Sequence, residues 1–449
     1  MFFNNKCIHN RNDFFYNENK VSRYAGGKRL KRVLCMLFVA FAMIFQFGCK
    51  TEEEMGGKEE EEEKKPEIFA PLTENGQLEA PKYESIDKFI YAKNPAIQSI
   101  VYDSVNYHGQ KTRVFAYLGF PEGASAAAPV PAVVLVHGGA GTAFAEWVEL
   151  WNHAGYAAIA MDTEGRYPDQ TTQGLGGPSN DQLYTAKYSI EEQWMYHAVS
   201  AVMKAESLLL ADPRVNAKQT GICGISWGSI VTAAALGVDE RFAFGIPIYG
   251  SGFQSESLGD FRRNMKEHAT KLWGAETLFP WYRAKVLWLN SDHDAFFSLN
   301  TTLKSAKYLK GSHATILPDL THGHIEGWTP KDSIYFADSV IAGKEMLADF
   351  LQQPKNVGER TELQISTGDA EFEKIELYAL TSPYEYVYDG ALPQIKQDFV
   401  RREVDFNVDR KTGKISFCLP EDVTVYYLNV TTKDNSGRKY VSTTELMQA

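Results

Sequence analysis

The sequence predicts an α/β fold built on a doubly wound, mostly parallel sheet, followed by a smaller all-β, sandwich-like domain. Between residues 81 and 353, short apolar runs typical of buried parallel strands alternate with amphipathic stretches typical of helices. Such alternation places helices on both faces of one sheet. Over residues 354–449 polar and apolar residues alternate instead, which indicates half-buried antiparallel strands. We therefore expect two folded domains with these boundaries.

The individual elements follow from apolar runs and turn residues. Two β segments flank His108-Gly109-Gln110 and predict a hairpin ahead of the parallel strands. The stretch Gln352–Gly358 breaks the helical pattern and is interpreted as a linker. The predicted parallel strands are 131–136, 156–161, 220–223, 242–248, 284–289 and 314–317; the predicted helices are 142–153, 189–211 and 333–351; the predicted antiparallel strands are 374–380, 399–408, 414–418 and 423–431.

The most informative motif is Gly224-Ile225-Ser226-Trp227-Gly228, which lies between a β-branched run and a helical stretch. At a strand-to-helix turn, Gly-x-Ser-x-Gly forms a nucleophile elbow, which exposes the serine hydroxyl above the sheet on strained backbone. Gly224 and Gly228 lack the side chains that would collide as such a turn closes. The helix that follows directs its positive end at the site. The pattern therefore predicts Ser226 as a nucleophile.

A glycine-rich segment, His137-Gly138-Gly139-Ala140-Gly141, leaves the first predicted parallel strand. Backbone with few side chains can approach a substrate closely and direct its N–H groups at a developing oxyanion. The alternative is a plain glycine turn. Because the segment precedes the elbow as an oxyanion loop does in hydrolases, we favour the oxyanion loop.

Two later strand ends carry candidates for an acid and a base. Asp292 and Asp294 follow one strand, and the aspartate that does not orient a histidine would be an ordinary turn residue. His322 and His324 follow the last strand, and we favour the pair Asp294 and His322. The chain order serine, aspartate, histidine is that of α/β-hydrolases. A metal site at these residues is the alternative, but their spacing matches no zinc-enzyme motif.

Residues from about 100 to 351 resemble the α/β-hydrolase superfamily, and within it the acetyl xylan esterase, cephalosporin-C deacetylase and dienelactone-hydrolase-like group. The specific matches are Ala211–Asn216, Tyr249–Phe253 and His322-Gly323-His324, the last followed by Gly327-Trp328. The chain departs from these relatives at Ser229, where members often have a second glycine. We expect this serine to change the packing of the helix and to leave the chemistry intact.

The resemblance implies a serine hydrolase that needs no metal or organic cofactor. Ser226 would be the nucleophile, Asp294 the orienting acid and His322 the base. The main-chain N–H groups of Gly139 and Trp227 would form the oxyanion hole. The implied activity is that of a serine esterase that deacylates an acetylated carbohydrate. The alternatives are a serine exopeptidase or oligopeptidase of the same fold, and a non-catalytic surface protein that binds glycans.

Residues 1–49 resemble a signal peptide of the lipoprotein type. Lys28–Arg32 is basic, and the apolar run Val33–Phe47 is too short to span a bilayer comfortably. Gly48-Cys49 resembles the end of a lipobox, and two acyl chains on Cys49 would anchor the protein stably in a membrane. Residues 50–80 begin with glutamate runs and are interpreted as a solvated tether. We expect the bacterial cell envelope, at the surface or periplasmic face of the outer membrane.

Composition limits the partners. The net charge of −11 repels phosphate backbones and argues against nucleic-acid binding, but it says nothing about the substrate. The expected partner, a small-molecule or oligosaccharide ester, is what the resemblance implies. Cys223 and Cys418 are expected to be small buried thiols, because a disulfide between them would have to join the two predicted domains. The insertion 254–281 carries aromatic residues that suit either stacking on sugar rings or packing on the core. For the C-terminal domain, glycan binding, contact with a partner and packing on the hydrolase stay open.

Overall fold

The structure is a computed structural model that describes residues 79–169, 174–178, 188–260, 267–388, 390 and 392–449. Cys49, the expected signal peptide and all but the last two residues of the expected tether lie outside these ranges. The described residues belong to one compact unit. None of the helices in the described ranges is long and apolar enough to cross a bilayer.

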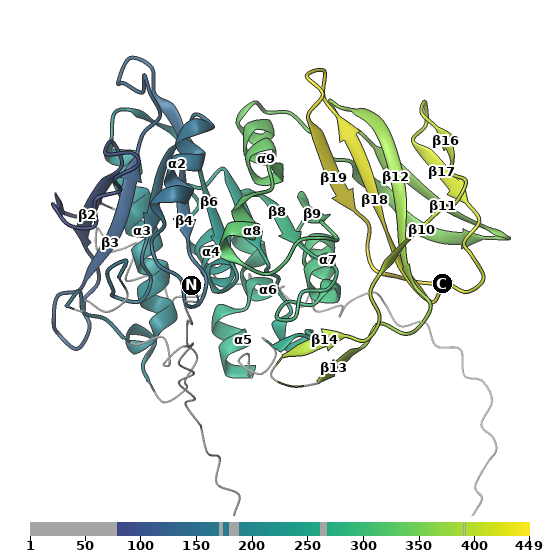
Figure 1. Cartoon of the computed structure of the whole chain (residues 1–449), viewed down its shortest axis with the longest axis horizontal. Helices are drawn as coiled ribbons and strands as arrows, with labels where there is room; N and C mark the ends of the chain where they lie inside the picture. The colour runs from purple at the N-terminus through teal and green to yellow at the C-terminus, as the bar shows by residue number, and fades with distance from the viewer. Residues whose placement is uncertain (1–78, 170–173, 179–187, 261–266, 389, 391) are drawn as a thin grey trace, which may run out of the picture. The chain divides into compact units, whose positions relative to one another are not determined.

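A nine-stranded sheet forms the larger part of the fold (Figure 1). Its strands are β1 (Tyr83–Ser85), β2 (Gln98–Asp103), β3 (Arg113–Gly119), β4 (Val130–Val136), β5 (Ala157–Met161), β6 (Val215–Ile225), β7 (Phe244–Ile248), β8 (Lys285–Asn290) and β9 (Ser312–Ile316). The strands lie in the order β1-β2-β3-β5-β4-β6-β7-β8-β9. β1, β2 and β3 pair antiparallel, and the strands from β5 to β9 pair parallel. The predicted hairpin and mostly parallel sheet are confirmed.

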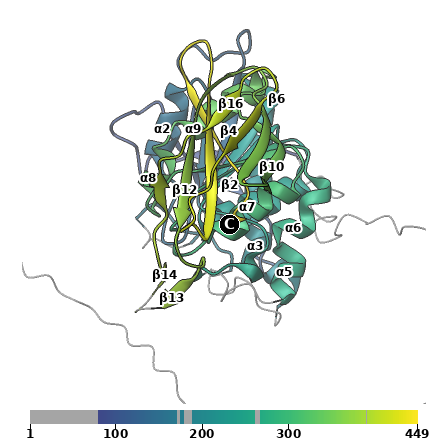
Figure 2. The same cartoon turned by 90° about the vertical axis from the view of Figure 1, so that its right-hand side faces the viewer.

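Helices cover both faces of this sheet, so strands β4, β5 and β7 consist of apolar residues along their whole length. The five longer helices are α2 (Ala145–His153), α3 (Trp194–Ala211), α4 (Trp227–Val238), α7 (Leu299–Tyr308) and α9 (Asp332–Ile341). Figure 2 shows α2 and α9 on one side of the sheet and α3 and α7 on the other. Every residue of β5 and β7 is buried between these layers. The shorter helices are η3 (Ile190–Glu192), η4 (Gln254–Glu256), α5 (Glu267–Trp273), α6 (Ala275–Leu278), η6 (Phe279–Trp281) and α8 (His324–Trp328).

The C-terminal region consists of antiparallel sheets, as predicted (Figure 1). Its strands are β10 (Asp349–Val357), β11 (Arg360–Ser366), β12 (Glu371–Leu380), β13 (Tyr386–Tyr388), β14 (Pro393–Ile395), β15 (Val400–Arg402), β16 (Asn407–Asp409), β17 (Lys414–Phe417), β18 (Val425–Lys433), β19 (Lys439–Thr443) and β20 (Met447–Gln448). One sheet has the order β10-β11-β17-β16, and the other has the order β15-β12-β18-β19 with β20 beside β18. The two sheets enclose a separate apolar core, and β13 and β14 form a hairpin outside both sheets.

Two sequence predictions at this boundary are wrong. The last helix ends at Ile341 and not at Leu351, because Gly343 adopts a positive φ of 63° that terminates it. The expected linker Gln352–Gly358 is instead most of strand β10. Pro354 favoured a linker, because proline has no N–H to donate to a sheet. In the structure it lies where the pairing register with β11 shifts.

Side chains of the C-terminal strands cover the free edge of β9. Asn429 on β18 donates its side-chain amide to the carbonyl of Ile316 at 2.9 Å, and Thr443 on β19 accepts from the N–H of Ile316 at 3.0 Å. Thr315 donates to the carbonyl of Val441 at 2.6 Å. An uncovered edge strand presents unpaired main-chain groups that invite aggregation. The C-terminal strands therefore cover the edge of the large sheet through side-chain contacts, without joining that sheet.

Cys223 is buried, but Cys418 is exposed, so the prediction of two buried thiols is wrong for Cys418. Phe417 points into the core between the sheets, and successive residues of an extended chain point to opposite faces. Cys418 follows Phe417 directly and therefore faces solvent.

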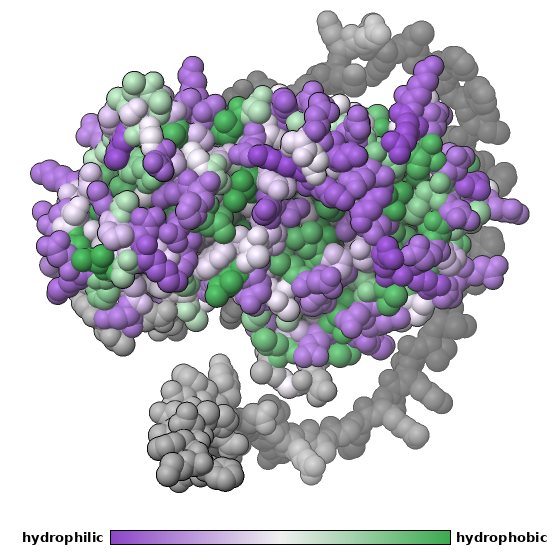
Figure 3. All heavy atoms as spheres, turned by 45° about the horizontal axis from the view of Figure 1, so that its top comes forward, coloured by the Kyte–Doolittle hydropathy of each residue, from purple (hydrophilic) through white to green (hydrophobic). Residues whose placement is uncertain are grey.

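Aromatic residues of the described part of the insertion, and Tyr282 beside it, pack on the core. Trp273 is fully buried and donates its indole N–H to the side-chain oxygen of Gln193 at 2.9 Å. Tyr282, just beyond the insertion, is buried and donates to the carbonyl of Ala233 at 2.5 Å. These two rings do not form a sugar-stacking platform. On the face drawn in Figure 3, hydrophilic side chains are spread widely between smaller hydrophobic areas.

A buried carboxyl group lies under the large sheet. Glu206 on α3 is fully buried and accepts a hydrogen bond from the hydroxyl of Thr220 on β6 at 2.5 Å. Its second oxygen has no hydrogen-bond partner among the described residues. Burial, together with the charge of Asp239, raises the pKa of Glu206 to about 8. The folded chain therefore keeps a proton that the unfolded chain releases near pH 4.3.

We predict that Glu206 makes the protein less stable as the pH rises from 5 to 8. The folded-state pKa is raised, so the stabilising contribution is complete below the unfolded pKa and is lost as the pH rises through the folded pKa. Glu206→Gln mimics the neutral acid. Between pH 5 and pH 8, its free energy of unfolding should fall by at least about 1 kcal/mol less than that of the wild type. Urea unfolding at pH 5 and pH 8 measures both values. Equal losses in the two proteins would contradict the prediction.

Candidate active site

The structure brings Ser226, His322 and Asp294 together in one hydrogen-bonded row. Ser226 Oγ lies 2.9 Å from His322 Nε2, and His322 Nδ1 lies 2.6 Å from Asp294 Oδ2. The three residues follow the carboxyl ends of β6, β9 and β8, where parallel strands deliver their loops to one side of the sheet. The Asp294 side chain is completely buried, that of His322 is 19% exposed, and Ser226 is half-buried. The nucleophile candidate is therefore reachable, whereas the acid is shielded from water.

Ser226 has the strained backbone expected of a nucleophile elbow. Its φ of 57° and ψ of −117° are rare for a residue with a side chain, and α4 begins at the next residue. A Cβ on Gly224 would lie 2.2 Å from the carbonyl oxygen of Gly228, and one on Gly228 would lie 2.1 Å from that of Val136. Any side chain at either glycine would push the turn open. The reason given for both glycines from the sequence thus agrees with the packing.

The carboxylate of Asp294 is held by main-chain donors as well as by the histidine. Its Oδ1 accepts hydrogen bonds from the N–H groups of Phe296 and Phe297, both at 2.8 Å. Asp292, the alternative acid, does not reach His322. Its oxygens accept from the Tyr427 hydroxyl at 2.7 Å and face Nδ1 of His293 at 3.0 Å. Of the two aspartates, the geometry places only Asp294 beside the base candidate.

Two aromatic rings to which the sequence assigned no role in the site pack on His322. The Tyr249 ring lies 4.5 Å from the imidazole and the Phe296 ring lies 4.6 Å from it, measured between ring centroids. Tyr249 also donates its hydroxyl to the carbonyl of Thr321, next to the histidine, at 2.6 Å. Tyr249 directly follows β7 and begins the family match Tyr249–Phe253, whereas Phe296 has only its place in the loop after β8 as a sequence signal.

Ser229 joins the elbow to the next strand end. Its hydroxyl lies 2.5 Å from the carbonyl oxygen of Ser226 and 3.0 Å from that of Tyr249. A Cβ on Gly250 would lie 2.2 Å from this hydroxyl, so the serine occupies space that Gly250 leaves open. Ser229 thus ties the nucleophile candidate to the residue that packs on His322.

The glycine-rich segment lies directly beside the elbow. A Cβ on Gly138 would lie 3.0 Å from the Cβ of Ser226, and one on Gly139 would lie 2.7 Å from Cδ1 of Trp227. The Gly138 N–H donates to Nε2 of His324 at 3.0 Å. His324, the alternative base, therefore holds this loop and does not contact Ser226 in the manner of His322.

His324 fits between the two ends of the loop. A Cβ on Gly141 would lie 2.6 Å from its Nε2, so only glycine leaves room for the imidazole. Burial, together with the nearby His137, lowers the pKa of His324 to about 4. At neutral pH the ring is uncharged and its Nε2 remains an acceptor for Gly138. Within the described ranges, no group of three or more His, Cys, Asp or Glu side chains is placed to hold a metal ion.

Comparison with known proteins gives a family match over part of the chain. The model of the Acetyl xylan esterase (AXE1) family matches residues 58–271, which include Ser226 but end before Asp294 and His322. The chain is a carboxylic ester hydrolase. The resemblance to the acetyl xylan esterase group of α/β-hydrolases is confirmed. Comparison with curated proteins gave no match for this esterase.

Solved structures with similar chains include two acetyl xylan esterases. The enzyme from Paenibacillus sp. R4 is 17% identical over 61% of this esterase and 94% of its own chain, with a TM-score of 0.48. Acetyl Xylan Esterase 1 from Thermoanaerobacterium sp. JW/SL YS485 is 15% identical with the same coverage and TM-score. An acylaminoacyl peptidase from Pyrococcus horikoshii is 19% identical over 54% of this chain and 40% of its own, with a TM-score of 0.40.

We predict that His324 is needed for the rate of ester hydrolysis and not for stability alone. His324→Leu removes the acceptor of the Gly138 N–H, and the kcat for an aryl acetate should fall by about tenfold or more because the loop beside Ser226 loses its anchor. His324→Gln offers a side-chain carbonyl in its place and should retain more activity. Melting temperatures of both variants provide the control. A wild-type kcat in His324→Leu would contradict the assignment.

Proposed function

We propose that the chain is a serine esterase that removes acyl groups, acetyl above all, from a carbohydrate. The hydrogen-bonded row from Asp294 through His322 to Ser226, with the serine on strained backbone, carries this proposal. The match to the acetyl xylan esterase family favours acetate as the acyl group and a polysaccharide or oligosaccharide as its carrier. The proposed catalytic roles are those predicted from the sequence.

In the first half of the proposed reaction, His322 takes the proton of Ser226 as Oγ attacks the ester carbonyl carbon. Asp294 accepts from Nδ1–H and stabilises the imidazolium that forms. The main-chain N–H groups of Gly139 and Trp227 hold the oxyanion of the tetrahedral intermediate. As the intermediate collapses, the carbon–oxygen bond to the sugar breaks, and the leaving alcohol takes the proton from His322.

In the second half, water replaces the sugar. His322 removes a proton from a water molecule, whose oxygen attacks the carbonyl carbon of the acyl-serine. The second tetrahedral intermediate breaks the bond to Oγ, releases the acid and returns the proton to Ser226. The burial of Asp294 suits both halves, because a shielded carboxylate interacts more strongly with the imidazolium than an exposed one.

We predict that the purified protein releases acetate from acetylated xylan oligosaccharides and that Ser226→Ala abolishes this release. The kcat/KM of the variant should be lower than that of the wild type by about 10³-fold or more, because the covalent step is lost. Its melting temperature should stay near that of the wild type. A panel of acetylated oligosaccharides, aryl acetates and dipeptidyl amides measures the specificity.

Cleavage of the amides in preference to the esters would replace the proposal by a peptidase. Wild-type acetate release by Ser226→Ala would overturn the assignment of the nucleophile. Failure of the wild type to react with a fluorophosphonate would indicate a non-catalytic glycan-binding protein.

We also propose that Cys49 is diacylated and anchors the enzyme in the bacterial cell envelope, at the surface or periplasmic face of the outer membrane. The basic region, the short apolar run and the cysteine support this proposal, and they lie outside the described residues. We predict that Cys49→Ser moves the protein from the membrane fraction to the soluble fraction of expressing bacteria, because the acyl chains are lost. Equal membrane fractions of the variant and the wild type would contradict the anchor.

A further inference from the structure

We propose that the C-terminal β domain positions the acid and the base of the active site, so that it acts as a part of the esterase. This inference rests on the proposed function of Asp294 and His322. Three tyrosine side chains, Tyr384, Tyr386 and Tyr427, carry it, and we refer to them as the tyrosine clamp. All three come from the C-terminal region, and all three contact the segment that connects β8 to α7 and contains Asp294.

Two members of the clamp come from the arm that leads into the β13–β14 hairpin. Tyr386 donates its hydroxyl to the main-chain carbonyl of Asp294 itself at 2.9 Å. Tyr384 accepts from the N–H of Leu299, where α7 begins, at 2.9 Å, and its own hydroxyl points to Tyr386 at 3.4 Å. In Figure 1 this hairpin lies apart from the other C-terminal strands, beneath α7. The arm of this hairpin therefore contacts both Asp294 and Leu299, which lies at the far end of the acid loop.

The third member comes from the sheet of the C-terminal domain. Tyr427 on β18 donates to Oδ2 of Asp292 at 2.7 Å, two residues before the acid. The hydroxyls of the clamp thus contact the loop at Asp292, Asp294 and Leu299. Burial holds the pKa of both Tyr427 and Tyr386 well above the usual value, so both hydroxyls stay protonated and donate.

The C-terminal domain also holds the strand end that leads to His322. Ile316 is the last residue of β9, and the chain runs from it directly to His322. Asn429 and Thr443 hold the carbonyl and the N–H of Ile316, so that the C-terminal domain fixes the point from which the base loop departs. The position of Ser226, by contrast, is set by β6 and α4 inside the hydrolase sheet.

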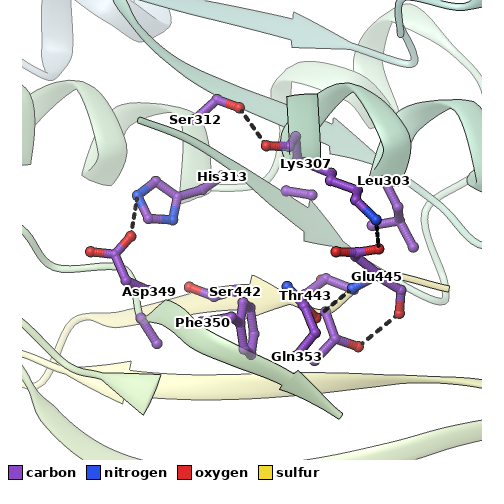
Figure 4. Close-up of a pocket in the computed structure, with 14 residues that line it drawn as sticks. Leu303, Lys307, Ser312, His313, Asp349, Phe350, Gln353, Ser442, Thr443 and Glu445 are labelled. Carbon is purple, nitrogen blue, oxygen red and sulfur yellow. Dashed lines mark hydrogen bonds and ion pairs between the residues drawn. The ribbon is translucent and has the colours of Figure 1, made fainter. Parts of the chain in front are cut away.

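The junction between the two domains is not tightly packed throughout. The contacts of the tyrosine clamp therefore differ from those in the rest of the junction. Figure 4 shows a pocket of about 270 Å³ between α7, β9, β10 and β19. Its sides carry partly exposed charged groups, among them the ion pair of Lys307 and Glu445 at 2.7 Å. Exposed pairs of this kind contribute little to stability. The clamp, in which Tyr427 is buried and Tyr384 and Tyr386 are half-buried, contacts the acid loop and is therefore the part of the junction on which catalysis should depend.

The test compares kcat and KM of full-length variants with an aryl acetate. Tyr386→Phe and Tyr427→Phe each keep the ring and remove the hydroxyl, and the double variant removes both. We expect the double variant to lose about tenfold or more in kcat while KM stays within about twofold, because a displaced acid loop misplaces the proton acceptor without changing the binding cleft. The kcat loss should exceed what the fraction of unfolded protein explains.

Two matched variants control for a general loss of packing. Tyr426→Phe removes a buried hydroxyl from the neighbouring position of β18, on the opposite face, where it hydrogen-bonds to Thr361. Lys307→Ala breaks the junction ion pair of Figure 4 without touching the acid loop. Both should keep kcat within about twofold of the wild type.

The outcomes separate this inference from the proposed function. If the wild type is active and Ser226→Ala is not, the proposed function holds; a wild-type kcat in the double tyrosine variant then overturns the clamp. Equal kcat losses in the double variant and in Tyr426→Phe also overturn it, because they indicate a general packing effect. If the double variant does not fold, Tyr386→Phe alone decides, since it leaves no buried charge without a donor. An inactive wild type refutes the proposed function before the clamp is tested.

Discussion

The close approach of three backbone segments at the elbow is the constraint on which the rest of the site depends. Gly228 lies against the carbonyl of Val136, and Gly224 lies against the carbonyl of Gly228. This packing holds Ser226 at a φ that costs on the order of 1–3 kcal/mol and that no isolated turn would keep. Because Val136 ends β4, the same contact forces the glycine-rich loop to leave its strand beside the serine. Ser226 and the glycine-rich loop are thus placed by the same packing contact.

The loop of His322 and His324 also holds two parts of the site at once. His322 and His324 are separated by one glycine, and the first contacts Ser226 while the second accepts from Gly138. A shift of this loop would therefore disturb His322 and the glycine-rich loop together. Burial gives the two rings different tasks, since it lowers the pKa of His324 to about 4 and keeps that ring a neutral acceptor. The two histidines, although only Gly323 separates them, therefore need not compete for the role of the base.

Local sequence was enough to predict the parts of the site that local geometry defines. The elbow around Ser226 combines a strand, two glycines and a helix within a few residues, and the alternating pattern identified the sheet. The choice between Asp292 and Asp294 was not decided by any local signal, because both follow the same strand. It is visible only in the folded chain, where Asp294 contacts His322 and Asp292 contacts Tyr427, 135 residues away. Strand β10 was missed because its proline sits at a register shift, which a single sequence does not reveal.

The position of β9 explains why an α/β-hydrolase of this kind gains from a second domain. Strand β6, which presents Ser226, has β4 on one side and β7 on the other, so its carboxyl end is fixed by neighbours along the sheet. Strand β9, which leads to His322, has β8 on one side only. Its other edge is held by Asn429 and Thr443, and the neighbouring acid loop is held by tyrosines of the same domain. The base and acid, which lie nearest the open edge of the sheet, are therefore the groups for which support from outside the hydrolase sheet has the greatest physical effect.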